Sequence, residues 1–160
     1  MAAKTLQEEI RKKRPFDQPE EEAALNLLRT IDAIRAPTDR LFAEHGLSDS
    51  QYNVLRILRG HGGDGVPCSE VGDQMITRMP DVTRLVDRLE QAKLVERART
   101  AADRRVVLVR LTDAGRALLE KLDEPVRQVH IDLLGHLSRT ELEELTRLLV
   151  KIRNPPLSTK

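Results

Sequence analysis

The sequence predicts a mainly α-helical protein with one small β-hairpin. Apolar residues recur at helical spacing over residues 20–45 and again over residues 112–153, on either side of the hairpin. Between residues 94 and 111 the pattern changes to two short strands that a polar turn joins. A chain of 160 residues with these elements is expected to form one continuous domain.

The composition favours a cytoplasmic protein without membrane contact. Charged residues make up 33% of the chain, and no apolar run approaches the ~20 residues that cross a bilayer. The first residues lack the apolar segment of a secretory signal. Cys68 is the single cysteine, which excludes a disulfide within the chain. Because Trp is absent and Tyr and Phe are scarce, the core must be aliphatic.

The N-terminal part is expected to be an arm, residues 1–19, followed by a long helix, residues 20–46. The arm either contacts DNA, embraces a partner subunit or is a solvated tail. Three glutamates at residues 20–22 suit the positive end of a helix dipole. Pro37 is expected to kink this helix, and Gly46 is expected to end it.

Local signals also define the next segment. Ser48 and Gln51 form a capping box that opens a helix ending near Gly60. Residues 60–65 match G-x-G-x-x-G, but this stretch follows a helix and opens none. We therefore expect a turn there rather than a dinucleotide site, and no cofactor.

Two short helices then precede the hairpin. The first begins at Cys68 or Ser69, a turn follows at residues 77–79, and the second is expected to begin with Pro80 at its first position. Its buried face carries Val82, Leu85, Val86 and Leu89. Two short helices joined by a tight turn are a helix-turn-helix pattern, and a hairpin directly after them makes a wing. The fold class is therefore a winged helix-turn-helix lobe, residues 47–112, with flanking helices.

The C-terminal part, residues 113–154, is expected to hold two helices. Thr112 caps the first, and Ser138 with Glu141 forms a capping box for the second. The last helix carries an apolar stripe made of Leu142, Leu145, Leu149 and Ile152. Little else in the chain can cover this stripe, so we expect a homodimer held by the first long helix and the last two.

The charge distribution allows two interpretations. Net charge is only +1, but nine basic and five acidic residues lie between Arg78 and Arg110. The middle of the chain is therefore basic and its flanks are acidic. This is either a local phosphate-binding surface or an ordinary solvated surface rich in arginine. Combined with the helix-turn-helix pattern, it favours double-stranded DNA as a partner.

Three stretches resemble the MarR (multiple antibiotic resistance regulator) family of winged-helix proteins. They are Leu47–Leu55, Val82–Glu90 and Asp103–Thr112, and the last continues into an L-T-x-x-G pattern that ends at Gly115. Together, in the right order and spacing, they indicate a resemblance that extends over roughly residues 20–153. The resemblance implies an obligate dimer on a pseudo-palindromic operator. It also implies that a small molecule, often an aromatic acid, or a redox or metal signal changes DNA affinity.

The resemblance assigns residues to the DNA contact. It places Asp81, Thr83, Arg84 and Arg88 on the recognition helix, and we expect the adjoining Thr77, Arg78 and Pro80 to belong to the same DNA-binding set. Those expected on the wing are Asp103, Arg104 and Arg105. The wing arginine, Arg105, would reach the minor groove, and Asp103 would orient it. Two alternatives stay open: Arg84 and Arg88 pair with acids on their own helix, or Arg105 pairs with Asp103 only to brace the hairpin.

Some residues depart from the family pattern or stay ambiguous. Lys93 stands where the family usually has Gly, so the helix end there lacks an inexpensive left-handed residue. Cys68 is either a thiol sensor near a helix N-terminus or a small buried apolar residue. The four histidines form no metal motif, so no metal is expected, although His45 could line a ligand pocket. The residues that bind an effector stay unknown.

The function predicted from these features is a sequence-specific DNA-binding transcriptional regulator, specifically a repressor that a small-molecule effector relieves. The alternative is a winged-helix module that binds proteins and not DNA. An enzyme is not expected, because the sequence holds no G-x-S-x-G, Walker or H-E-x-x-H motif.

Overall fold

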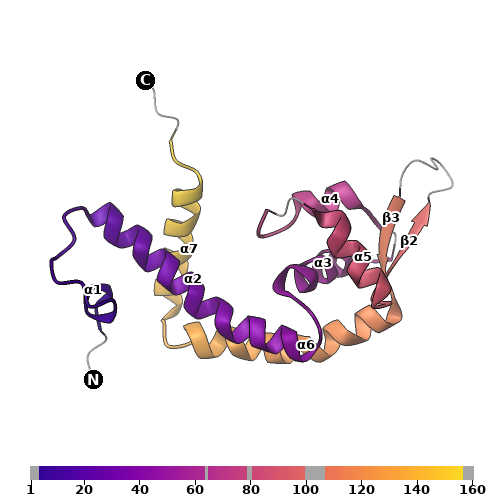
Figure 1. Cartoon of the computed structure of the whole chain (residues 1–160), viewed down its shortest axis with the longest axis horizontal. Helices are drawn as coiled ribbons and strands as arrows, with labels where there is room; N and C mark the ends of the chain where they lie inside the picture. The colour runs from indigo at the N-terminus through magenta and orange to yellow at the C-terminus, as the bar shows by residue number, and fades with distance from the viewer. Residues whose placement is uncertain (1–3, 64, 79–80, 100–106, 157–160) are drawn as a thin grey trace.

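The computed structural model describes residues 4–63, 65–78, 81–99 and 107–156. Its elements are α1 (Leu6–Glu9), α2 (Pro19–Glu44), α3 (Asp49–Gly60), β1 (Val66–Pro67), α4 (Cys68–Asp73), α5 (Val82–Gln91), β2 (Val95–Arg99), β3 (Val107–Leu111), α6 (Asp113–Leu134) and α7 (Arg139–Arg153). Figure 1 shows α3, α4, α5 and the sheet gathered in one lobe, from which α2 and α6 extend to the other side. The prediction of a winged helix-turn-helix lobe with flanking helices is confirmed.

The core of the protein lies in this lobe and in the parts of α2 and α6 that touch it. Its largest fully buried side chains come from five helices and the sheet, and include Phe42, Leu55, Leu89, Val109 and Leu119. The ring of Phe42 stacks on Tyr52 with 4.3 Å between their centres. Burying each such aliphatic side chain contributes about 1.5–3 kcal/mol to folding. The expected aliphatic core is therefore present, with one aromatic pair.

Side-chain caps begin the helices where the sequence predicts them. Ser48 and Gln51 make the capping box of α3, and Ser138 and Glu141 make that of α7. The hydroxyl of Thr112 accepts the N–H of Gly115 at 3.1 Å and caps α6. Each cap satisfies backbone donors that the first turn of a helix leaves unpaired.

The sheet contains a short strand that the sequence analysis missed. β1 pairs with β3, so the order is β1-β3-β2 and all neighbours are antiparallel. Val66 lies opposite Val109, and both side chains are buried. Two residues are too few to show an alternating pattern, and this pairing joins positions far apart in the sequence. The expected turn before the strand is present, with positive φ at Gly62 and Gly65.

The ends of α2 and α5 share one geometry. Gly46 (φ 69°) and Lys93 (φ 61°) are both left-handed. After each, the next N–H donates to the carbonyl five residues earlier, from Leu47 to Phe42 and from Leu94 to Leu89. This is the Schellman arrangement. Lys93 thus adopts the left-handed conformation at the position where Gly was expected to be missed, and the hydrogen bonds from the N–H groups of Lys93 and Leu94 offset the strain of a side chain in that conformation.

The start of α5 also differs from the expectation. The helix begins at Val82, and Asp81 is its N-cap, with Oδ1 accepting the N–H of Arg84 at 3.1 Å. Pro80, expected at the first helical position, precedes the helix and lies outside the described residues. An aspartate at the N-cap position satisfies a donor of the first turn, so α5 starts two residues later than proline alone suggests.

The L-T-x-x-G pattern joins α6 to the lobe. The Thr112 hydroxyl donates to the carbonyl of Lys93 at 2.8 Å. Gly115 packs so closely on this turn that a Cβ there would collide with the carbonyl oxygen of Leu94. Only glycine permits this approach, so the start of α6 is fixed against the turn that links α5 to the hairpin.

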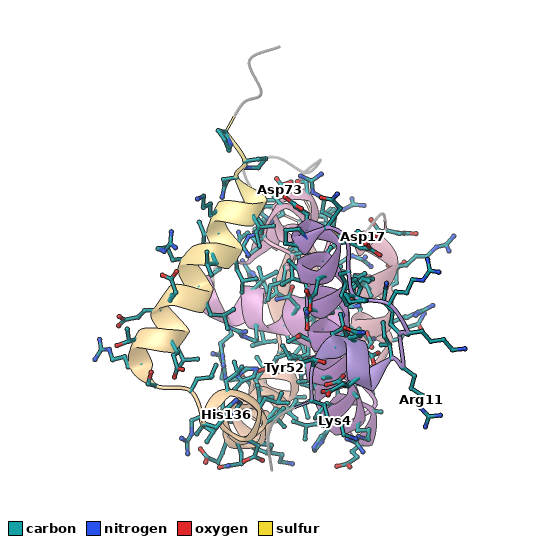
Figure 2. All side chains as sticks on the ribbon, turned by 90° about the vertical axis from the view of Figure 1, so that its left-hand side faces the viewer. Lys4, Arg11, Asp17, Tyr52, Asp73 and His136 are labelled. Carbon is teal, nitrogen blue, oxygen red and sulfur yellow. The ribbon has the colours of Figure 1, made fainter. Side chains whose placement is uncertain are left out.

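The elements beyond the lobe bury much less. α7 contains no buried residue, and Figure 2 shows it standing apart from α2. The expected arm, residues 1–19, contains the short helix α1, where Leu6 is buried and Ile10 is exposed. None of the helices in the described part of the chain combines the length and apolarity that a membrane span needs.

Candidate nucleic-acid interface

α5 presents two contrasting faces. Leu85, Val86 and Leu89 are buried in the lobe, whereas Thr83, Arg84 and Arg88 are exposed. Arg84 and Arg88 are separated by one helical turn and lie on one side of the helix, and Thr83 lies at the edge of that side. This side carries two cations and a hydroxyl, which are groups that can contact phosphates or base edges.

Arg84 is partnered but remains available. Its Nε lies 2.8 Å from Oδ2 of Asp81, and its side chain is 80% exposed. An exposed pair three residues apart contributes less than ~1 kcal/mol. The open alternative of pairing along the helix is thus present for Arg84, yet the guanidinium can leave Asp81 at small cost. The Asp81 carboxylate, by contrast, is needed to cap the helix.

Two residues expected on the recognition helix lie before α5 and not on it. Thr77 and Arg78, expected on the recognition helix, belong to the exposed connection between α4 and α5. Asn53, a buried residue of α3, anchors this connection to the core, because its Oδ1 accepts the N–H of Ile76 at 3.0 Å. No local pattern predicts this contact, because it joins residues 23 positions apart.

Arg97 of β2 is an arginine whose role the sequence analysis did not identify. Its guanidinium contacts Asp87 at 2.6 Å and Glu90 at 2.8 Å, both on α5. Partial burial opposes the charge of Arg97, but the hydrogen bonds and charges of these two acids outweigh it and raise its pKa. Of the acids on α5 that could pair with an arginine of the same helix, Asp81 does so with Arg84, whereas Asp87 pairs with Arg97 of β2.

The wing joins the same surface. β2 and β3 pair in register from Val95 opposite Leu111 to Arg99 opposite Val107, which confirms the predicted hairpin. The expected wing residues Asp103, Arg104 and Arg105 lie outside the described residues. Arg99, at the described end of β2, is exposed.

A hollow of about 120 Å³ lies behind this surface, between the lobe and the helices α2 and α6. Among the residues that line it are Phe42, Tyr52, Asn53, Arg56, Ile76 and His130. Burial raises the pKa of the Tyr52 hydroxyl, which keeps it neutral. His45, expected as a candidate lining residue, is exposed elsewhere, and the histidine at this hollow is His130.

Cys68 and the metal-ligating residue types are the remaining candidates of the sequence analysis. Cys68 is half-buried at the start of α4. Within the part of the chain that the structure describes, no group of three His, Cys, Asp or Glu side chains could hold a metal ion.

The comparisons with known proteins identify the family. A MarR family model matches residues 45–106, which hold α3 to β2 and their connections. The HTH-type transcriptional regulator MhqR of Bacillus subtilis is 32% identical over 127 residues, covering 79% of this chain and 86% of MhqR. The chain belongs to the MarR family. The HTH-type transcriptional repressor MdtR of the same organism is 27% identical, covering 85% of this chain and 86% of its own.

Solved structures agree with this assignment. A MarR transcription factor from Planctomyces limnophilus is 47% identical with a TM-score of 0.66, covering 84% of this chain and 98% of that one. MepR of S. aureus, solved with DNA, is 26% identical with a TM-score of 0.71, at coverages of 79% and 93%. BpsR of Bordetella bronchiseptica, whose DNA binding is regulated by 6-hydroxynicotinic acid, is 27% identical with a TM-score of 0.76, at 89% and 100%. The protein is a MarR-family transcriptional regulator.

Proposed function

We propose that this protein is a dimeric, sequence-specific repressor that places α5 in the major groove of double-stranded DNA and the wing in the adjacent minor groove. The observation that carries the proposal is the exposed face of α5, with Thr83, Arg84 and Arg88, directly beside the hairpin. Helix and hairpin have the relative order that winged-helix proteins use on DNA.

The relatives support DNA as the partner and repression as the outcome. MepR was solved with DNA, and MdtR is named a repressor. The alternative, a winged-helix module that binds only proteins, is not favoured by these relatives. The relatives are regulators, so we propose no catalytic role. Such a regulator would act in the cytoplasm, where it meets its operator.

We propose that the dimer forms through α2, α6 and α7. Leu145 and Ile152 on α7, Ile31 on α2 and Ile131 on α6 are exposed large apolar side chains. Leu142 and Leu149 complete the α7 stripe and are half-buried. Apolar stripes of this kind are normally covered by a second copy in helical proteins. Residues 20–46 and 113–154 would then form the dimer body, and residues 47–112 the DNA-binding lobe.

A two-fold dimer requires an operator with matching symmetry. Two recognition helices would contact half-sites about 10 base pairs apart, centre to centre, or a multiple of this spacing. Selection of bound DNA from a random pool tests this directly. An inverted repeat is the expected result, and selected sites without dyad symmetry would contradict the proposal.

A gel-shift series on the selected site tests the contact residues. Arg84→Ala should weaken binding by about 1–3 kcal/mol and relax preference at one position in each half-site. Arg127→Ala removes the same charge from α6, where Arg127 pairs with Glu124 on the same helix, and serves as the control. Affinity should fall steeply with salt for the wild-type protein. Equal affinity of both variants would exclude Arg84 as a base contact.

The wing residues need a separate measurement. If Arg105 reaches a narrow minor groove, Arg105→Ala should reduce affinity for most sequences and make the salt dependence shallower. Asp103→Ala should have the same effect but a smaller one. If Arg105 only braces the hairpin, the same change would lower the melting temperature and leave the salt dependence unaltered.

We also propose that a small aromatic acid acts at the hollow between the lobe and α6. The stacked rings of Phe42 and Tyr52 offer an aromatic wall, and Arg56 offers a cation for a carboxylate. The volume is below the ~300 Å³ typical of ligand pockets, so binding would have to open the hollow. A panel of aromatic acids should lower DNA affinity 5–150-fold, roughly the range of allosteric coupling. If none alters affinity, and Arg56→Ala has no effect, the site is not here.

A further inference from the structure

Arg97 connects the hairpin to the helix that we place on DNA. From β2, its Nη1 donates to Glu90 Oε2 at 2.8 Å, and its Nη2 lies 2.6 Å from Asp87 Oδ1. Nη2 also donates to the backbone carbonyl of Thr83 at 3.4 Å. The backbone N–H of Arg97 donates to Glu90 Oε1 at 3.1 Å, so both oxygens of Glu90 are engaged.

The acceptors are spread along α5 rather than gathered at one point. Thr83, Asp87 and Glu90 are separated by four and three residues, so they lie on one face over two helical turns. A planar guanidinium with five donors can hold several acceptors in fixed directions. One side chain therefore restrains both the distance of β2 from α5 and the rotation of the helix relative to the strand.

Arg97 restrains β2 at a point beyond the root of the hairpin. The root of the hairpin is anchored in the core by Val95 on β2. Arg97 stands two residues further out, opposite Val109, and its side chain is 25% exposed. It thus ties β2 to α5 at a second point beyond the root, and two points fix the direction of a strand where one point leaves it free to swing.

The neighbouring face of α5 is the one with Arg84 and Arg88. Both are exposed, and each is one residue beyond an acceptor of Arg97, namely Thr83 and Asp87. One side of α5 therefore faces β2 of the hairpin, and the adjacent side, with Arg84 and Arg88, faces solvent. The angle between helix and hairpin decides whether both reach the same DNA duplex.

We propose that Arg97 is a positioning residue that sets the angle between the wing and the recognition helix, so that the two engage adjacent grooves together. The inference rests on the proposed DNA-binding function. Arg97 acts through the wing and need not touch DNA itself. Without it, the helix still offers its outward side chains to the major groove, but the wing is no longer held over the minor groove.

The test uses the full-length protein and a duplex carrying the site that the wild-type protein selects from a random pool. Arg97→Gln should weaken binding by about tenfold, the size expected for losing charge-assisted hydrogen bonds. At saturating protein, dimethyl sulfate should still show protected guanines in the major groove. Hydroxyl-radical cleavage should show lost protection of the flanking minor groove. Arg97→Lys keeps the charge without the fork and should show a partial loss. Arg127→Gln is the matched control and should leave both patterns unchanged.

A triple variant separates positioning from charge. Arg97→Gln leaves the carboxylates of Asp87 and Glu90 unpaired near DNA phosphates, which by itself would weaken binding. Arg97→Gln combined with Asp87→Asn and Glu90→Gln removes that repulsion. The triple variant still lacks the contacts that restrain β2 against α5. Continued loss of minor-groove protection in the triple variant supports positioning. Full recovery of affinity and protection would overturn it.

The remaining outcomes also decide the question. Wild-type affinity and protection in a folded Arg97→Gln protein, judged by its circular dichroism melting curve, would overturn the proposal. If Arg97→Gln does not fold, Glu90→Gln alone loosens the same contact, and intact minor-groove protection there would overturn it. If the wild-type protein selects no DNA, the proposed function itself fails and the inference with it.

Discussion

The winged-helix lobe and the last helix use the same kind of apolar residue but bury it to different extents. Leu55, Leu58 and Leu89 of the lobe have 2% exposure or less. α7 contains four leucines, of which none is buried. The helices of both regions are amphipathic. The difference in burial therefore comes from the elements that surround each helix and not from the sequence of the helix itself.

The lobe and α7 obtain their stability in different ways. The lobe is covered within the same chain, because its helices, the sheet and the adjoining parts of α2 and α6 all contribute to one core. α7 depends on local devices, namely its capping box and the exposed pairs of Arg139 with Glu143 and Arg147 with Glu144. A helix of 15 residues is only marginally stable by such means. The proposed dimer would cover α7, whereas the lobe is already covered within one chain.

The largest expected effect comes from placing a charge on the α7 stripe. Leu145→Glu should abolish dimers and DNA binding together, because a carboxylate would be buried without a partner in the subunit contact. Light scattering and gel shifts on the same samples measure both. Thr140→Glu adds the same charge at an exposed position of α7 and should leave both intact. A Leu145→Glu monomer that still binds the operator would refute the dimer proposal.

The next effect contrasts two leucine truncations. Leu89→Ala in the lobe core should lower the free energy of unfolding by about 2–5 kcal/mol through lost burial and a cavity. Leu148→Ala on α7, where the side chain is 42% exposed, should cost much less in the separated protomer. Denaturant unfolding at low protein concentration measures the two. Equal losses would show that α7 is already packed within one chain.

A smaller effect concerns the ion pair that joins the lobe to α6. Arg59 of α3 binds Asp123 of α6 through two hydrogen bonds of 2.8 Å. The hydrogen bond from Arg59 lowers the pKa of Asp123. Because the folded pKa is depressed, the stabilisation is complete above the unfolded pKa of about 3.9 and is lost as pH falls through the folded value.

Asp123→Asn should therefore reduce stability at neutral pH, by less than ~1 kcal/mol because both groups are partly exposed. The difference from wild type should disappear in acid below both pKa values. Glu124→Gln, whose partner Arg127 lies on the same helix, is the control and should change stability less. Unfolding curves at several pH values measure this, and a difference that grows with acidity would contradict the assignment.

The smallest effect is at the end of α5. Lys93→Gly should stabilise the fold by about 0.5–1 kcal/mol, because glycine adopts positive φ without steric strain. Part of this gain is offset because glycine gives the unfolded chain more conformational freedom. Lys93→Ala keeps the strain and removes the charge, so it should leave the melting temperature nearly unchanged. A lower melting temperature for Lys93→Gly would show that the lysine side chain itself stabilises this turn.

The structural features that depend only on neighbours along the chain could be predicted from the sequence alone. The capping boxes, the left-handed Gly46 and the buried stripe of α5 involve residues within five positions of each other. Such contacts form wherever the local pattern occurs, so spacing rules are sufficient to predict them. The order of helices and hairpin followed from the same rules.

The tertiary structure decided the features that join distant residues. The pairing of β1 with β3, the bond from Ile76 to Asn53 and the contacts of Arg97 with α5 all need the folded arrangement. Lys93 becomes left-handed because Thr112 and the hydrogen bonds around it fix the turn. Hydrogen bonds between separate elements depend on distance and direction in space, which no periodicity along the sequence encodes. The buried and exposed faces of α5 were therefore predictable from the sequence, whereas the contact that ties this helix to β2 was not.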